Sequence, residues 1–176
     1  MKTTHFYPIG TPGQPWGAAE LAQWRARQVR QRSYADDVLH AVDHLRDRFD
    51  VESYGEVVYA DEHRPAEHFP LMALRTRNWQ SSLSTVLVTG GVHGYETSGV
   101  HGALRFAQAH AADYAGRVNL LVAPCVSPWA YERIQRWNFD AIDPNRSFRE
   151  SSPAQESAAL MRLVAPLRGQ FAAHID

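Results

Sequence analysis

The chain has 176 residues, which suits one domain with a sizeable hydrophobic core. Its 18 lysines and arginines nearly balance its 19 aspartates and glutamates, and the net charge of -1 leaves no broad field to attract nucleic acid or an anionic membrane. Cys125 is the only cysteine, which excludes an internal disulfide and a thiolate zinc cluster, and the lack of an export signal or an apolar run of about 18 residues predicts a cytoplasmic protein without a membrane span.

The amino-terminal part of the sequence predicts an arm followed by two helices. Proline and glycine at turn density over 9–17 indicate that residues 1–16 form an extended arm ahead of a single domain. Hydrophobic spacing predicts a polar helix over 18–31 and a second helix over 33–49, with Ser33 as its N-cap. Apolar residues at helical spacing give the second helix a core face: Val38, Leu39, Val42, Leu45 and Phe49.

The rest of the chain predicts strands that alternate with helices. Short strands at 57–59 and 71–74 flank the polar loop "DEHRPAEH", 61–68, and a strongly apolar strand at 84–89 could be buried on both faces. Further elements follow in this order: a helix over 97–112, a strand over 117–124, helices over 128–134 and 153–167, and the start of a strand over 170–176. This alternation predicts an α/β fold with a sheet that is at least partly parallel.

The segment "GGVHGYETSG", 90–99, carries the first candidate site. It puts His93 and Glu96 just past the end of an apolar strand, where ligands collect in α/β sheets. Side chains at i and i+3 share one face of a helical turn, and a catalytic zinc ion commonly takes nitrogen and oxygen ligands from three side chains. A capping glutamate beside an ordinary histidine is the alternative for an isolated H-x-x-E pattern, but the strand-end position favours a metal site.

The segment "RWNFDAIDPNRSF", 136–148, is the second candidate. Loops that are this polar and aromatic often line functional sites. Arg146 can grip a carboxylate with two parallel N–H groups, Asn145 can add a donor, and Arg136 can stabilise an oxyanion. The alternative is a surface loop held by aspartate–arginine pairs, which contribute little to stability.

Several segments in order along the chain resemble the M14 zinc carboxypeptidase superfamily: "VTGGVHGYETSGV", "PCVSPWAYERIQRWN", "DPNRSF" and "HID", with "FYPIGTPGQPWG" near the start. The chain looks most like the bacterial metallocarboxypeptidases of this superfamily, neighbours of the succinylglutamate desuccinylase and aspartoacylase group. The resemblance implies an α/β/α sandwich around a mixed sheet and one zinc ion held by His93 and Glu96. It also implies that Asn145 and Arg146 bind the substrate carboxylate and that Arg136 polarises the scissile carbonyl.

The chain departs from this pattern at its end. Family members continue from a strand of the "HID" type into Leu-His, whose histidine is the third zinc ligand, and a general-base glutamate comes later, whereas this chain ends at Asp176. Strand alternation puts His174 and Asp176 on one face, so His174 is expected to neighbour the site, with replacement of the third ligand as the alternative. We therefore expect an amino-terminal portion whose carboxy-terminal part is missing, and which is weakly active or inactive alone.

The predicted function is that of a zinc-dependent metallocarboxypeptidase, which hydrolyses an amide bond next to a free carboxylate. An N-acyl amino acid deacylase of the succinylglutamate desuccinylase/aspartoacylase type is the alternative enzyme. A truncated, non-catalytic domain that binds a carboxylate ligand or a partner chain is the alternative from another class. The expected partner is thus a peptide or acyl-amino-acid substrate, and the sequence leaves its side-chain preference and the oligomeric state open.

Other histidines and the cysteine predict no further site. His40 and His44 lie at i and i+4, but the glutamate of an H-E-x-x-H motif is missing, so a solvated helix face is expected. His63 and His68 lie in a charged loop and are expected at the surface. Cys125 ends an apolar strand and is expected to be a buried small side chain instead of a nucleophile.

Overall fold

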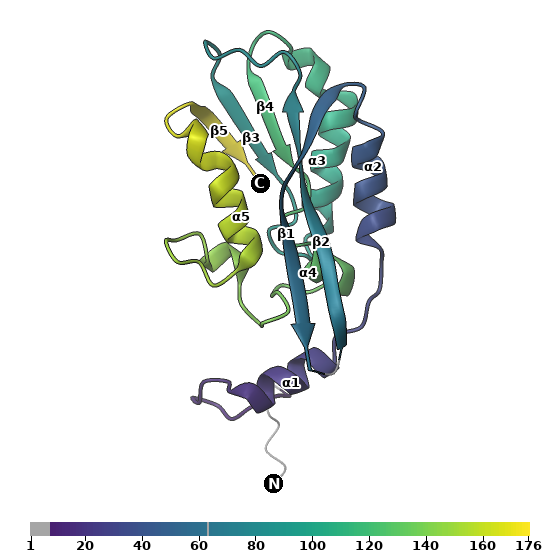
Figure 1. Ribbon diagram of the computed structural model, residues 1–176, viewed down its shortest axis with the longest axis vertical. Helices are drawn as coiled ribbons and strands as arrows, with labels where there is room; N and C mark the ends of the chain where they lie inside the picture. The colour runs from purple at the N-terminus through teal and green to yellow at the C-terminus, as the bar shows by residue number, and fades with distance from the viewer. Residues whose placement is uncertain (1–7, 63) are drawn as a thin grey trace.

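The computed structural model describes residues 8–62 and 64–176, and its centre is a five-stranded mixed sheet (Figure 1). In spatial order the strands are β1 (Phe49–Asp61), β2 (Arg64–Thr76), β4 (Asn119–Ala123), β3 (Thr85–Thr89) and β5 (Phe171–Ile175). The hairpin of β1 and β2 is antiparallel and joins β4 in antiparallel pairing, whereas β3 runs parallel to both β4 and β5. The predicted partly parallel sheet is confirmed.

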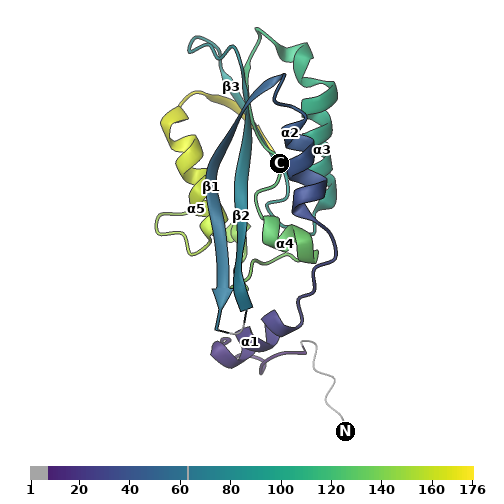
Figure 2. The same cartoon turned by 45° about the vertical axis from the view of Figure 1, so that its right-hand side comes forward.

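Helices cover both faces of this sheet (Figures 1 and 2). On one face lies α5 (Gln155–Val164), and on the other lie α2 (His40–Asp43), α3 (Thr97–Ala109) and α4 (Pro128–Arg133). The short α1 (Ala18–Ala26) lies beyond the end of the β1–β2 hairpin. One π-helical and three 3-10 turns complete the described elements: η1 (Ala35–Leu39), η2 (Ala111–Tyr114), η3 (Pro144–Arg146) and η4 (Ala165–Leu167). The arrangement is the α/β/α sandwich that the family resemblance implies.

The core lies on both sides of the sheet. The larger cluster joins the strands to the helices α2, α3 and α4 and includes Val38, Val42, Val100, Leu104, Val122 and Trp129. Smaller clusters under α5 join Leu87 and Leu121 to Leu167, and Val92 to Leu160. Burial of each such aliphatic side chain contributes about 1.5–3 kcal/mol. Because both faces of β3 and β4 are packed against helices, these strands are held firmly in place. The loops that follow them therefore begin at well-defined positions.

Two of the predicted helices are shorter than expected. The helix expected over 18–31 ends at Ala26. The helix expected over 33–49 is helical only from Ala35 to Asp43, and after a run of turns Phe49 opens β1. The Ser33 hydroxyl does accept a hydrogen bond from an N–H of the first turn, at 3.1 Å, so the predicted start of this helix holds. The residues predicted to form its core face are also confirmed in the core, because Leu45 in the following turns and Phe49 at the start of β1 are buried together with Val38 and Val42.

The predicted polar loop over 61–68 is wrong, because β1 ends at Asp61 and β2 begins at Arg64. Pairing across the hairpin continues into this polar segment, for example between Tyr59 and Glu67. The hairpin extends past the sheet, so both of its faces can carry polar side chains. Residues 8–17 form neither helix nor strand, while His63 and residues 1–7 of the predicted arm lie outside the described residues.

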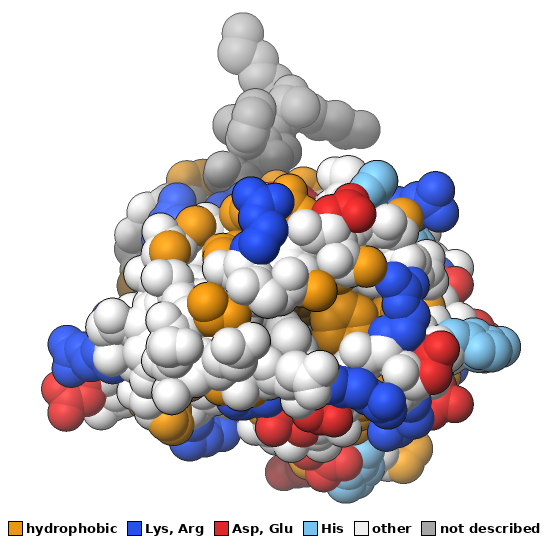
Figure 3. Space-filling model, turned by 90° about the horizontal axis from the view of Figure 1, so that it is seen from above, with side chains coloured by type: hydrophobic (Ala, Val, Ile, Leu, Met, Phe, Trp, Pro, Cys, Tyr) orange, Lys and Arg blue, Asp and Glu red, His pale blue; other side chains and the backbone are white. Residues whose placement is uncertain are grey.

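Basic and acidic side chains are interspersed over the face of the molecule seen from above (Figure 3). This mixture agrees with the net charge of -1, and the described residues visible in this view form no single-sign patch. Among the residues described, the helices are too short or too polar to cross a membrane.

Candidate functional site

A tight turn after β3 places His93 and Glu96 at the carboxyl end of the strand. The turn is closed by a hydrogen bond from the Glu96 N–H to the His93 carbonyl oxygen, at 3.0 Å. Gly94 lies in the middle of this turn, and a Cβ there would overlap the backbone of Ala130 and Tyr131 in α4. The glycine therefore allows the turn to pack directly on α4, and this contact fixes where the two candidate ligands lie.

The imidazole of His93 lies between two carboxylates. Its Nδ1 is 2.8 Å from Glu96 Oε1, and its Nε2 is 3.0 Å from Asp143 Oδ1. The ring is almost fully buried and stacks on Tyr95 with centroids 5.9 Å apart. When Nε2 carries the proton and donates to Asp143, the Nδ1 lone pair and Glu96 Oε1 are two acceptors that face each other. In that tautomer a cation would satisfy both, and a ring nitrogen and a carboxylate oxygen are donors that suit zinc. With the proton on Nδ1, the same contact is a hydrogen bond from His93 to Glu96.

The Glu96 carboxylate does not cap α3, which was the alternative to metal binding. Glu96 is the N-cap residue of α3 by position, but its side chain makes no hydrogen bond to the N–H groups of the helix. It is directed at His93 Nδ1 instead, at 2.8 Å.

Asp143 connects His93 to Arg136. Its Oδ2 accepts a hydrogen bond from Arg136 Nε at 3.1 Å and forms an ion pair with Nη2 at 2.9 Å, and Arg136 Nη1 donates to the hydroxyl of Tyr95 at 3.1 Å. Burial alone would raise the pKa of Asp143, but the hydrogen bonds and charges of His93 and Arg136 outweigh it and lower this pKa. Hydrogen bonding to Tyr95, followed by that to Asp143, raises the pKa of Arg136. The aspartate–arginine pairing named as the alternative for this loop is thus present, but it lies against His93.

Sequence reasoning missed Asp143 as an individual residue. It was one of two aspartates in a polar loop, and no local pattern distinguishes it from Asp140, which pairs with Arg25 at 2.6 Å. A weak signal is present in "DPN", since an aspartate before proline often begins a short helix. Asp143 indeed caps η3, and its Oδ1 accepts from the Asn145 N–H at 2.9 Å.

The helix η3 presents Asn145 and Arg146, and both are exposed. Asn145 borders a cavity of about 300 Å³, whose other walls include Phe148 and His174. Hydrogen bonds link Asp143, at the base of η3, to His93, so the two predicted segments meet at one place. Arg136 reaches His93 through Asp143, whereas Arg146 faces solvent.

His174 and Asp176 point to one face of β5, as strand alternation predicts. Both contact the hydroxyl of Thr89, at 2.8 Å from His174 Nε2 and 2.6 Å from Asp176 Oδ1. Within residues 8–62 and 64–176, no group of three or more histidine, cysteine, aspartate or glutamate side chains is arranged to hold a metal ion. The described residues therefore do not present His174 as a third ligand.

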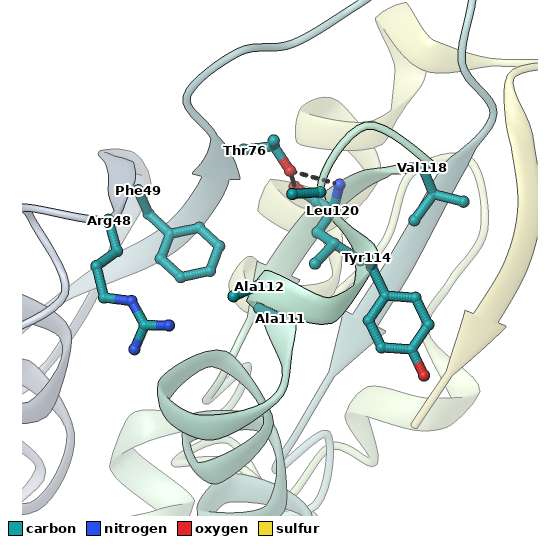
Figure 4. Close-up of a pocket in the computed structure, with 9 residues that line it drawn as sticks. Arg48, Phe49, Thr76, Ala111, Ala112, Tyr114, Val118 and Leu120 are labelled. Carbon is teal, nitrogen blue, oxygen red and sulfur yellow. Dashed lines mark hydrogen bonds between the residues drawn. The ribbon is translucent and has the colours of Figure 1, made fainter.

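A separate cavity of about 210 Å³ lies at the opposite end of the parallel strands (Figure 4). Its lining is mainly apolar and includes Phe49 and Tyr114, and Thr76 Oγ1 accepts a hydrogen bond from the Leu120 N–H at 2.7 Å. Leu120 belongs to the start of β4, whereas His93 follows the end of β3. This cavity is therefore not part of the candidate metal site.

His40, His44 and Cys125 lie where the sequence predicts, whereas His68 is at the surface but in a strand. The rings of His40 and His44 are exposed and touch each other, with their Nε2 atoms 2.7 Å apart. His68 is exposed but lies in β2 and pairs with Glu56 at 3.3 Å, so its expected place in a loop is wrong. Cys125 is buried, and burial raises the pKa of its thiol, as expected of an inert cysteine.

Comparisons with known proteins find the fold among solved structures. A protein from Shewanella baltica with the provisional name of metallopeptidase is 23% identical over 80% of this chain and 56% of its own, with a TM-score of 0.62. A metallo-carboxypeptidase from Burkholderia cenocepacia is 17% identical over 87% of this chain and 38% of its own, with a TM-score of 0.55. The chain has a metallocarboxypeptidase-like fold.

An aspartoacylase family protein from Mesorhizobium loti shares this fold too, at 23% identity over 73% of this chain and 40% of its own, with a TM-score of 0.53. No family model matches the chain, and no curated protein matches it. The chain spans about half the length of the first solved structures that it matches. At such identities these similarities show the fold alone.

Proposed function

We propose that this chain provides the zinc-binding and carboxylate-binding part of a metallocarboxypeptidase, which hydrolyses an amide bond next to a free carboxylate. One observation carries the proposal: Nδ1 of His93 and Oε1 of Glu96 converge to 2.8 Å while Asp143 engages Nε2. Metal-binding histidines usually donate their second ring N–H to a carboxylate, which fixes the tautomer and the ring orientation. A carboxylate on each ring nitrogen, at the carboxyl end of a buried strand, supports a role of His93 in metal binding.

In this proposal each residue has a separate task. Zinc held by His93 and Glu96 would supply a Lewis acid and lower the pKa of a coordinated water. Arg136, oriented by Asp143 and Tyr95, would stabilise negative charge on the carbonyl oxygen during attack.

Substrate anchoring falls to Asn145 and Arg146. Both side chains are exposed on η3, and an arginine can bind a carboxylate with two parallel N–H donors. Two protein ligands leave a zinc ion largely solvated, so we expect the described residues to bind zinc weakly and to hydrolyse substrate slowly.

Two alternatives are each favoured by one observation. The shared fold of an aspartoacylase family protein favours an N-acyl amino acid deacylase, which would use the same two ligands on a smaller substrate. The lack of a third ligand among residues 8–62 and 64–176 favours a non-catalytic domain that binds a carboxylate ligand or a partner chain.

The first test is a Zn²⁺ titration of the metal-free protein, followed by NMR. Weak, saturable binding is expected for the unchanged chain and is expected to be lost in His93→Gln. The matched control is His110→Gln, because His110 is an exposed histidine at the far end of α3. No zinc binding by the unchanged chain, or equal binding by His93→Gln, would refute the proposed metal site.

The second test is hydrolysis at saturating zinc with two substrate sets, N-blocked dipeptides and N-acyl amino acids. Cleavage of the dipeptides is expected and supports the carboxypeptidase. Cleavage of N-acyl amino acids alone supports the deacylase. Binding of a carboxylate ligand without hydrolysis of either set supports the non-catalytic domain.

A further inference from the structure

We infer that Arg32 is a positioning residue of the candidate metal centre, because its guanidinium holds the turn that carries His93 and Glu96. The inference rests on the proposed function, since it concerns the same metal site. Arg32 belongs to the segment between α1 and η1, more than 60 residues before the turn in sequence. No motif of the sequence points to it.

Four contacts direct the Arg32 guanidinium. Nη2 donates to the Gly94 carbonyl oxygen and Nη1 donates to Thr97 Oγ1, both at 2.7 Å. Nε donates to the Tyr131 carbonyl oxygen at 2.6 Å, and the guanidinium carbon lies 3.8 Å from the centre of the Tyr131 ring. The planar fork of an arginine can make such bonds at once, whereas a lysine offers a single point charge. Two of the three hydrogen bonds thus hold the turn that carries the candidate ligands: one ends on Gly94 within the turn, and the other on Thr97, directly after Glu96.

The bond to Gly94 fixes the central peptide of the turn. This peptide joins Gly94 to Tyr95, and it is held on both edges: the carbonyl oxygen by Arg32 and the Tyr95 N–H by the Gln135 carbonyl oxygen at 3.0 Å. The two common β-turn types differ by a flip of their central peptide, and the flipped form requires positive φ at the third residue, here Tyr95. Arg32 therefore opposes a flip that would re-aim Tyr95 and Glu96 relative to His93.

A purely structural role for Arg32 is the competing explanation. A cation near the C-terminus of α4 is favourable, and the bond to the Tyr131 carbonyl would satisfy that role alone. The same charge beside Thr97, in the first turn of α3, is unfavourable for the dipole of α3. The bonds toward the turn are thus not explained by helix stabilisation.

The test compares Arg32→Met and Arg32→Lys with a matched control, Arg30→Met. Arg30 lies on the same segment but pairs with Glu132 at 3.0 Å and does not reach the turn. In a Zn²⁺ titration followed by NMR, the dissociation constant should rise about 10- to 100-fold in Arg32→Met, as for other lost outer-shell contacts. It should rise less in Arg32→Lys and stay unchanged in Arg30→Met.

Amide hydrogen exchange gives a readout that does not need zinc. The Tyr95 amide should exchange faster in Arg32→Met than in Arg30→Met, while the amides of β3 and β4 stay protected in both. If the unchanged chain binds no zinc, the proposed function fails, and the exchange of Tyr95 still tests the hold on the turn. Equal zinc affinity and equal Tyr95 exchange in the two variants would overturn the inference. Should Arg32→Met fail to fold, Arg32→Lys gives the same comparison with the charge retained.

Discussion

His93 Nδ1 and Glu96 Oε1 lie 2.8 Å apart at the carboxyl end of β3, across one tight turn. The turn alone does not orient the histidine ring, because the second ring nitrogen is engaged by Asp143 from a loop 50 residues later. The geometry of the pair therefore depends on contacts from outside the H-x-x-E motif, and these contacts can be removed one at a time.

Asp143→Asn is expected to weaken zinc binding about 10- to 100-fold, because the substitution removes the negative charge that favours a proton on His93 Nε2 and so leaves Nδ1 free to bind a metal ion. Isothermal or NMR titration with Zn²⁺ measures this change. Asp140→Asn is the matched control, since Asp140 is an aspartate of the same loop that pairs with Arg25 instead. Similar zinc affinities of the two variants would show that Asp143 does not support the histidine.

Gly94→Ala is expected to destabilise the fold by about 1–3 kcal/mol or more, because the new methyl group would overlap the backbone of α4. Urea denaturation gives the free energy of unfolding. The matched control is Gly102→Ala in the middle of α3, where a Cβ meets no atom within 4 Å. This control should gain about 0.5–1 kcal/mol of stability, since alanine favours helix over glycine. A Gly94→Ala chain as stable as the control would contradict the packing of the turn on α4.

The sequence predicts those parts of the fold that local patterns determine. β3 and β4 are short apolar runs between turn residues, and their strands lie within a residue or two of the expected ranges. The predicted strands at 57–59 and 71–74 lie within β1 and β2, but the full length of the two strands was missed, because the polar part of the hairpin has no strand-like alternation and is held by cross-strand pairing, such as that of Tyr59 with Glu67. Pairing of this kind can override local propensity.

The same division holds at the candidate site. His93 and Glu96 could be found because the strand, the glycines and both side chains are contiguous in sequence. Asp143 and Arg32 could not be assigned, because they act only through contacts that span 50 and 62 residues. Nothing in the local sequence distinguishes these two residues from the other aspartates and arginines of the chain. Only the folded structure shows which aspartate and which arginine make the contacts.

Cys125 is expected to resist thiol reagents until the protein unfolds. The side chain is buried, and burial raises the pKa of the thiol, so little thiolate forms near neutral pH. Labelling with a disulfide reagent at increasing urea should follow the unfolding transition. A control chain with Cys125→Ala and Ser81→Cys moves the thiol to an exposed position and should react at once. Fast labelling of Cys125 under native conditions would contradict its burial.

Glu156 is expected to make the free energy of unfolding depend on pH. Burial raises the pKa of this carboxyl above 4.5, although hydrogen bonds from Tyr59 Oη at 3.0 Å and Asn138 Nδ2 at 3.4 Å partly oppose the shift. Between the unfolded and the folded pKa, the folded chain binds more protons than the unfolded chain, so stability must fall as the pH rises through this interval. Each unit of pKa difference corresponds to about 1.4 kcal/mol.

Glu156→Gln keeps the shape of the side chain and removes its titration. We expect this variant to gain stability relative to the unchanged chain as the pH rises above 4.5, measured by urea denaturation. Groups that titrate in both chains cancel in the difference between them. Glu150→Gln is the control, because Glu150 is exposed and its substitution should leave the pH profile unchanged. A difference between Glu156→Gln and the unchanged chain that stays constant with pH would show that the buried carboxyl keeps its ordinary pKa.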